Sequence, residues 1–168
     1  MQPALATQRL NLIPVSGEEV AFVRLAMGLL GGEASDIWRR TAETILHEHL
    51  DPLSMTALWR IAAENDANTG LIGLATPGVA VGSLRAIGWR SLELVVAVTP
   101  WNRRVGLAAE AIDAVVEHAL SDGVTFAVLS AVAVGNDGGH ALMHRCRFEE
   151  LGRITAISRQ FVVYERAG

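Results

Sequence analysis

The sequence contains no lysine, so all 14 of its basic residues are arginine, a bias that we attribute to genomic base composition rather than to function. Cys146 is the only cysteine, which excludes an intrachain disulfide and is compatible with a reducing compartment. The N-terminal residues also lack the apolar core of a signal peptide. We therefore expect a cytoplasmic protein.

Long apolar runs and a strong net charge are missing as well. The longest apolar run, at residues 124–134, contains threonine and serine and is too short to cross a bilayer. The formal net charge is -4, so no general field attracts the chain to nucleic acid or to an anionic membrane. We expect neither as a partner, whereas a mildly acidic surface is compatible with a cationic amine substrate.

The composition is that of a globular protein. The chain has 168 residues, of which 51% are hydrophobic and 19% charged, which is enough for one complete core. No internal repeat, low-complexity tract or linker divides it. We expect a single domain over residues 1–168.

Hydrophobic periodicity predicts the order of helices and strands. Strands are expected at residues 9–15, 57–64, 71–76, 91–99, 124–134, 149–157 and 160–166, and helices at 16–27, 33–50, 106–120 and 136–146. Residues 65–70 are rich in turn formers and predict a hairpin, and residues 77–89 a glycine-rich loop. The strand, helix and strand at residues 91–134 predict a right-handed crossover between parallel strands. The expected fold class is α/β (α+β), with a mixed, mostly antiparallel sheet of six to seven strands flanked by about four helices.

The most informative segment, residues 100–111, joins a buried strand to a helix. It contains Arg103-x-x-Gly106-x-Ala108, whose small residues allow close backbone approach. The amides of a first helical turn have no partner within the helix, and the dipole is positive at that end. The segment therefore predicts a pyrophosphate site on the amides of residues 104–109, although a tight turn with solvated arginines would look similar.

Motifs along the chain resemble those of the GNAT superfamily of N-acetyltransferases, and most of all its branch of ribosomal-protein N-terminal acetyltransferases. The family's acetyl-CoA motif, Arg/Gln-x-x-Gly-x-Gly/Ala, is matched at residues 103–108. Further matches, in the order of the family, are the opening Thr7-Gln8-Arg9-Leu10, Leu92-Glu93-Leu94, Pro100, Ala109-Glu110-Ala111, Asn136 and Phe148. The resemblance covers nearly the whole chain.

The resemblance implies a single GNAT domain that moves an acetyl group from acetyl-CoA, its co-substrate, directly to a primary amine on a protein N-terminus or a small molecule. It implies a strand that splays from its parallel neighbour, so that free amides around Val98 bind pantetheine and polarise the thioester carbonyl. The implied cofactor-binding residues are Ala97, Val98, Thr99, Arg103, Arg104, Val105, Gly106, Leu107, Ala108, Ala109, Asn136 and His140.

Glu93 is the only charged residue of the strand at 91–99 and is the candidate catalytic base. It would take a proton from the ammonium, through water, so that the neutral amine attacks. A solvated residue at the start of a strand is the alternative interpretation. Glu64, at the end of the hairpin strand, is a weaker candidate.

Several positions depart from the family pattern. Gly139 replaces a serine, Arg147 replaces a glycine, and Val95-Val96 replaces Gly-Tyr. The helix after Asn136 lacks the family's frequent catalytic tyrosine, so no general acid is assigned. Arg147 stands where a helix end favours a left-handed glycine, so either the turn differs or some strain is tolerated.

Other reactive side chains give weaker signals. His140 and His144 lack a third ligand and an adjacent glutamate, so we expect no metal. Three interpretations of His140 stay open: a contact to the cofactor, the general acid that is otherwise unassigned, or a residue on the helix surface. Arg145 and Arg147 either meet the 3′-phosphate of CoA or are solvated. Cys146 is expected to be packed. The tryptophans, Trp38, Trp59, Trp89 and Trp101, are core candidates, with Trp89 also a candidate for a substrate cleft.

Two other classes of function stay open at this stage. One is a non-catalytic acyl-CoA-binding or sensor domain, which the missing tyrosine and altered serine favour slightly. The other is an unrelated nucleotide-binding domain. The sequence leaves open whether the chain is a monomer or a homodimer.

Overall fold

A computed structural model describes residues 2–15, 55–77, 81, 84, 90–156 and 159–168. The helices expected at residues 16–27 and 33–50 lie outside the described residues, as does most of the loop expected at 77–89. Everything below concerns the described part of the chain.

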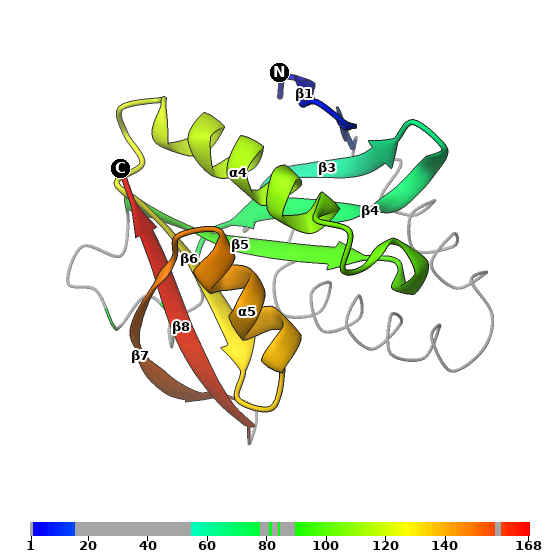
Figure 1. Cartoon of the computed structure of the whole chain (residues 1–168). Coiled ribbons are helices and arrows are strands. Elements are labelled where there is room, and N and C mark those ends of the chain that lie inside the picture. The colour runs from blue at the N-terminus through cyan, green and yellow to red at the C-terminus, as the bar shows by residue number, and fades with distance from the viewer. Residues whose placement is uncertain (1, 16–54, 78–80, 82–83, 85–89, 157–158) are drawn as a thin grey trace.

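The centre of the molecule is one sheet with the strand order β1-β2-β3-β4-β5-β6-β8-β7 (Figure 1). The strands are β1 (Leu5–Ala6), β2 (Leu10–Pro14), β3 (Met55–Ala63), β4 (Asp66–Ala75), β5 (Ser91–Val98), β6 (Ala127–Ala133), β7 (Glu149–Ala156) and β8 (Arg159–Ala167). Only β5 and β6 pair in parallel, which confirms the mixed, mostly antiparallel sheet. The described residues form eight strands rather than six to seven, because two-residue β1 is too short to show a pattern and forms by pairing with β2.

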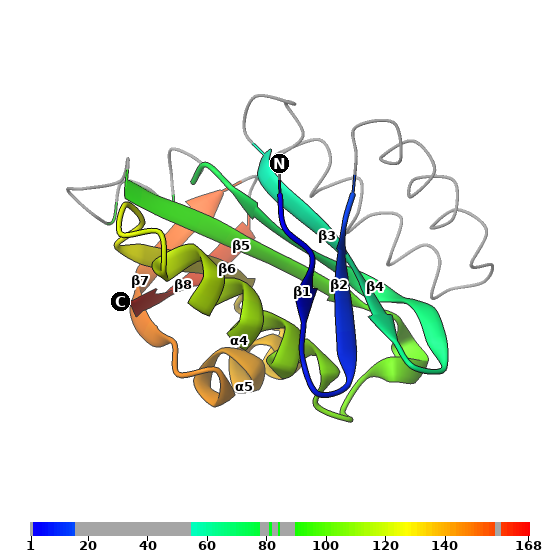
Figure 2. The same ribbon diagram turned by 90° about the horizontal axis from the view of Figure 1, so that it is seen from above.

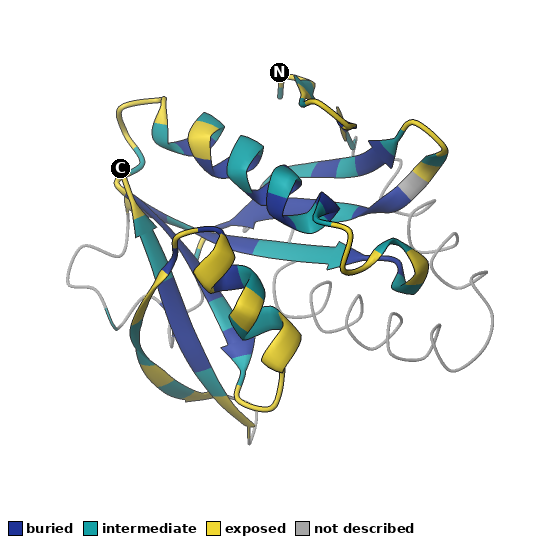
Figure 3. Ribbon diagram, viewed as in Figure 1, coloured by how far each residue is buried: buried dark blue, intermediate teal, exposed yellow. Residues whose placement is uncertain are grey.

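Two α-helices, α4 (Leu107–Leu120) and α5 (Asp137–Arg145), lie on one face of this sheet (Figure 2). The described part of the chain therefore holds two α-helices rather than about four. The inward positions predicted for α4 are confirmed as buried: Leu107, Ile112, Val115, Val116 and Ala119. They pack on the apolar residues of the strands beneath, and Figure 3 shows buried positions along the inner side of α4 and the middle of the sheet.

The hairpin of β3 and β4 is tighter than the sequence predicts. Ala63 pairs with Asp66, so the turn consists only of Glu64 and Asn65. The expected turn at residues 65–70 is wrong beyond Asn65, because β4 begins at Asp66. Asp66 and Gly70 pair with β3, and residues 67–69 lie in an irregularity of the register. Thr69 is fully buried there, and its hydroxyl donates to the Asp66 carbonyl and accepts from the Ala63 amide. Cross-strand hydrogen bonds thus override local turn preference.

Helix α5 ends in a Schellman motif with an arginine at the left-handed position. The Phe148 amide donates to the Met143 carbonyl at 3.0 Å and the Arg147 amide to the His144 carbonyl at 3.1 Å. Arg147 has φ +62°, so of the two alternatives at this position the turn is kept and the strain is tolerated. A side chain in this conformation costs about 1–2 kcal/mol relative to glycine.

Replacing Arg147 with glycine should stabilise the fold by about 0.5–1 kcal/mol, because relief of the left-handed strain exceeds the added entropy of the unfolded chain. The measurement is the free energy of unfolding in urea. Arg147→Ala is the matched control, since it removes the same charge and keeps the Cβ. The explanation is contradicted if the glycine variant is no more stable than the alanine variant.

Candidate active site at the carboxyl end of β5

The segment between β5 and α4, residues 99–106, is called the cofactor loop below. It begins with a short 3-10 helix, η2 (Pro100–Asn102), and is fixed at its base by Thr99. The amide and hydroxyl of Thr99 both donate to the Thr69 carbonyl, at 2.9 and 3.1 Å, and its carbonyl accepts from the Asn102 amide. All polar groups of Thr99 therefore have partners within the protein, and Thr99 anchors the base of the loop.

Asp66, at the start of β4, anchors the next part of the loop. Its Oδ2 accepts from the side-chain amide of Asn102 at 2.7 Å and from the indole of Trp101 at 3.2 Å. Trp101 is 59% exposed, so the expectation that it belongs to the core is wrong, whereas Trp59 is fully buried as expected. Trp38 and Trp89 lie outside the described residues.

The end of the loop has the backbone expected of an anion site. Arg104 has φ +62° and Gly106, the N-cap of α4, has φ +87°. The amides of Leu107, Ala108 and Ala109 form the first turn of α4 and have no acceptor within the helix. Residues 103–105 are exposed around them. The Arg103 Nε donates to the Val98 carbonyl at 3.2 Å and so holds the loop against β5.

Strands β5 and β6 are paired over three residues only, from Ser91–Ala127 to Glu93–Leu129. On its other edge β5 remains paired with β4 as far as Val98. The hydroxyl of Ser130 donates to the Leu94 carbonyl at 3.3 Å where the two strands separate. Among the described residues no strand pairs with this edge of β5 beyond Glu93, which matches the splayed strand that the resemblance implies.

Alternation along β5 decides which backbone groups face this gap. The Leu94 carbonyl faces β6, whereas the Thr99 amide bonds to β4. Because successive residues of a strand direct their polar groups to opposite edges, Val96 and Val98 face the gap and Ala97 faces β4. The polar groups of Val98 therefore face the gap, whereas those of Ala97 face β4. Those of Val96, which was not singled out from the sequence, also face the gap.

Glu93 lies at the closed end of the gap and is 3% exposed. The side chains of Leu92, Leu94, Val96 and Val98 pack on the same face of the sheet as α4. The Glu93 side chain therefore lies on the opposite face, as does Leu129, its partner on β6. Its burial contradicts the alternative of a solvated residue.

By contrast Glu64, the weaker candidate for the base, is exposed in the β3–β4 turn.

Asn136 and His140 organise the start of α5. The Asn136 Oδ1 caps the helix by accepting from the Gly139 amide at 2.9 Å. A Cβ on Gly139 would lie 2.7 Å from the Asn136 Nδ2 and 2.8 Å from the Val132 Cγ1, so the family's serine would not fit here without a shift.

His140 connects α5 to β6 and β8. Its Nε2 lies 3.2 Å from the Val134 carbonyl and its Nδ1 lies 2.9 Å from the hydroxyl of Tyr164. Because a carbonyl can only accept, Nε2 donates and Nδ1 accepts the tyrosine proton in neutral His140. Tyr164 is 3% exposed, and burial raises the pKa of its hydroxyl. His140 thus has internal partners on both ring nitrogens.

Glu110, in the first turn of α4, joins the start of the chain to the cofactor loop. Its Oε1 accepts from the Thr7 hydroxyl and the Arg9 amide, and its Oε2 accepts from the Arg9 Nε at 2.7 Å. The Arg9 Nη1 also donates to the Val105 carbonyl at 3.0 Å. The sequence analysis missed this connection, although its signal was present in the opening Thr-Gln-Arg-Leu match.

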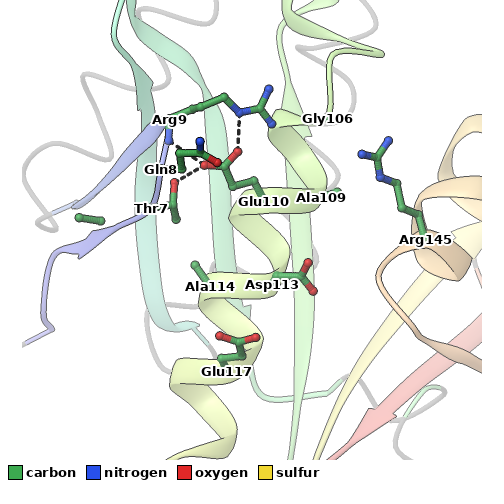
Figure 4. Close-up of a pocket in the computed structure, with 11 residues that line it drawn as sticks. Thr7, Gln8, Arg9, Gly106, Ala109, Glu110, Asp113, Ala114, Glu117 and Arg145 are labelled. Atoms are coloured by element: carbon green, nitrogen blue, oxygen red, sulfur yellow. Dashed lines mark hydrogen bonds and ion pairs between the residues drawn. The ribbon is translucent and has the colours of Figure 1, made fainter.

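A pocket of about 510 Å³ lies along α4 between the β1–β2 turn and the end of α5 (Figure 4). Gly106 and Arg9 line one end, and Asp113 and Glu117 the other. Arg145 reaches into it from α5, whereas the Arg147 Nη2 is directed to the Asp113 Oδ1, 3.8 Å away.

The remaining candidates for chemistry are inert or absent in the described part of the chain. Cys146 is buried, as expected, and burial raises the pKa of its thiol to about 11. No group of three or more potential metal ligands occurs among the described residues. In the same residues, no helix is long and apolar enough to span a membrane.

The family model described as Acetyltransferase (GNAT) family matches residues 33–148 of the chain. No curated protein matches the chain. Among solved structures, a putative GNAT-family acetyltransferase from Bordetella pertussis has a TM-score of 0.69 at 18% identity, covering 99% of this chain and 100% of its own.

Two solved structures with named acceptors are also similar. RimL, a ribosomal-protein alpha-N-acetyltransferase, has a TM-score of 0.67 at 12% identity, covering 100% of this chain and 96% of its own. A chimera of the spermidine N-acetyltransferase SpeG from Vibrio cholerae has a TM-score of 0.63 at 16% identity, covering 95% and 96%. At these identities the likeness is one of fold.

The Glu110 contacts make the junction of β1, β2 and α4 sensitive to acid. Burial raises the pKa of Glu110, but the hydrogen bonds from Thr7 and Arg9 together outweigh it and lower the pKa below its ordinary value of 4.5. A lowered folded-state pKa means that the stability from Glu110 is complete above about pH 4.5 and is lost as the pH falls through the folded value.

Glu110→Gln should therefore lower the free energy of unfolding by about 1–3 kcal/mol at pH 7 relative to the wild type. This difference should shrink as the pH falls below the ordinary pKa of glutamate. Urea unfolding from neutral to acid pH measures it. Asp137→Asn, which removes an exposed carboxylate from α5, is the control. A difference between Glu110→Gln and the wild type that does not change with pH would contradict the explanation.

Proposed function

The chain belongs to the acetyltransferase (GNAT) family and acetylates amines with acetyl-CoA as its co-substrate, and from that premise we propose that the thioester and the amine meet in the gap between β5 and β6. The observation that carries the proposal is the short pairing of the two strands, which ends at Glu93 while β5 continues to Val98. A paired central strand would have no main-chain donors to offer a ligand.

The described residues fit acetyl-CoA along its length. The amides of Leu107, Ala108 and Ala109, at the positive end of α4, suit the pyrophosphate. The backbone groups of Val96 and Val98 face the gap and suit the amides of the pantetheine arm. In this arrangement the thioester carbonyl accepts from the Val98 amide, which stabilises the negative charge that forms on its oxygen.

Transfer then proceeds in one complex. Glu93 accepts a proton from the ammonium through a water molecule, and the neutral amine attacks the thioester carbon. The new C–N bond forms, the C–S bond breaks, the sulfur leaves with its electron pair, and the nitrogen releases its second proton to solvent to give the amide. A thiol has a pKa of about 8.5, so the thiolate departs without a protein acid and takes its proton from solvent. A missing helix tyrosine is therefore compatible with turnover.

We propose a primary amine with a net positive charge as the acceptor. The net charge of -4 favours cations at the surface. The structurally similar RimL acts on a ribosomal-protein N-terminus, and SpeG acts on spermidine. A peptide with a free α-amine and a polyamine are therefore the first acceptors to compare.

The decisive experiment measures release of CoA thiol from acetyl-CoA across a panel of amines, with acetylated product identified by mass spectrometry. Wild-type protein should turn over at least one amine. Glu93→Gln should lower kcat by about 10²- to 10⁴-fold, leave acetyl-CoA affinity unchanged and recover part of the rate at high pH, where the amine deprotonates itself.

Glu64→Gln is the matched control, because it removes an exposed glutamate from the adjacent hairpin and should behave as wild type. Full activity of Glu93→Gln would contradict only the role of Glu93 as the base and would leave the acetyltransferase activity standing. Acetyl-CoA binding with no turnover of any amine would instead favour the acyl-CoA-binding or sensor domain, and stabilisation by ATP or NAD but not by CoA would favour a nucleotide-binding domain.

A further inference from the structure

Two guanidinium groups converge on Gly106 at the start of α4. The Nη2 atoms of Arg9 and Arg145 each lie 3.3 Å from the position that a Cβ would take on Gly106, so the two atoms are no more than twice that distance apart. Arg9 belongs to the turn between β1 and β2, and Arg145 to the last turn of α5. Figure 4 shows the two side chains on opposite sides of Gly106.

The carboxylates of the pocket leave Arg145 without a counter-charge. Glu110 is bonded to Arg9, and Asp113 and Glu117 both face Arg166, with Nη···O distances of 2.5 and 3.9 Å. Within the described part of the chain, Arg145 forms no ion pair. Arg145 thus brings a positive charge with no ion-pair partner among the described residues to the positive end of a helix dipole, an arrangement that a bound anion would stabilise.

The hydrogen bonds of Arg9 direct one edge of its guanidinium toward Gly106. Its Nε is held by the Glu110 carboxylate and its Nη1 by the Val105 carbonyl, so Nη2 remains directed toward Gly106. A guanidinium fixed in this way has already lost its rotational freedom, and its planar fork matches phosphate oxygens. Gly106 has no side chain, which keeps the space between the two groups open.

We propose that Arg9 and Arg145 form a clamp across Gly106 that holds one phosphate of CoA, with Glu110 as the positioning residue for Arg9. The proposal rests on the proposed function, since it takes CoA as the source of the anion. Arg147, the other arginine considered for this role from the sequence, is directed to Asp113 instead. The clamp adds to the amides of α4 two charged donors from segments distant in the sequence.

Arg145→Gln is the primary variant, because Arg145 has no ion pair among the described residues and its loss should leave the fold intact. Affinities for CoA, 3′-dephospho-CoA and pantetheine are measured by calorimetry, or by thermal shift where binding is weak. The variant should bind CoA about 10- to 100-fold more weakly and pantetheine as wild type does. A loss limited to CoA identifies the 3′-phosphate, and a loss shared by CoA and dephospho-CoA identifies the pyrophosphate.

Arg9→Gln should show the same selectivity. The double variant Arg9→Gln with Arg145→Gln should lose less CoA binding free energy than the two single variants lose together, because both arginines donate to one phosphate. Glu110→Gln keeps both arginines and should weaken CoA binding with no effect on pantetheine, which a purely structural role would not produce. Arg159→Gln removes an exposed arginine from β8 and is the charge-matched control.

The clamp is overturned if Arg145→Gln and Arg9→Gln leave the ratio of CoA to pantetheine affinity unchanged, or if Arg159→Gln changes it equally. That result leaves the proposed function standing as long as wild-type protein binds CoA. Wild-type protein that binds no CoA would overturn the proposed function itself.

Discussion

The separation of β5 from β6 is the constraint on which the site depends. A parallel pair at the centre of a sheet normally satisfies its main-chain groups along its whole length, yet here the pairing stops at Glu93 and Leu129. The hydroxyl of Ser130 satisfies the first carbonyl beyond that point. The sheet stays continuous because β4 keeps β5 in register on its other edge. One edge of β5 thus supplies stability, and the other supplies donors for a ligand.

Glu110 provides the second fixed point of the site. Its carboxylate accepts from two residues of the β1–β2 turn, and the same turn reaches the carbonyl of Val105 in the cofactor loop. The first residues of the chain therefore hold the cofactor loop in place, although they are about a hundred positions away in sequence. Strand β1 is only two residues long, and its role in the fold is to support this turn.

Much of this arrangement could be predicted from the sequence because it is local. Alternating and helical patterns located the described strands and helices α4 and α5 near the residues observed. The place of Arg147 after α5 indicated either a different turn or the strained left-handed conformation that the structure has. Glycine spacing located the start of α4. These features depend on neighbouring residues, which the sequence displays directly.

The features that the sequence did not predict depend on partners far along the chain. Asp66 and Gly70 pair with β3 in spite of their preference for turns, and Trp101 is exposed because its indole donates to Asp66 at the surface. Whether the backbone groups of Val96 or those of Ala97 face the gap could be decided only from the strands that lie on each edge of β5. The approach of Arg9 to Gly106 required the whole fold.

The anchoring of the cofactor loop by Asp66 has a consequence for the order of events in binding. The residues after β5 lose their conformational freedom when the β3–β4 hairpin folds, since Asn102 and Trp101 both bond to Asp66, the first residue of β4. Ordering a loop during association costs affinity and slows encounter. Here that entropy is lost during folding, so in the proposed site acetyl-CoA meets a loop that the β3–β4 hairpin has already ordered.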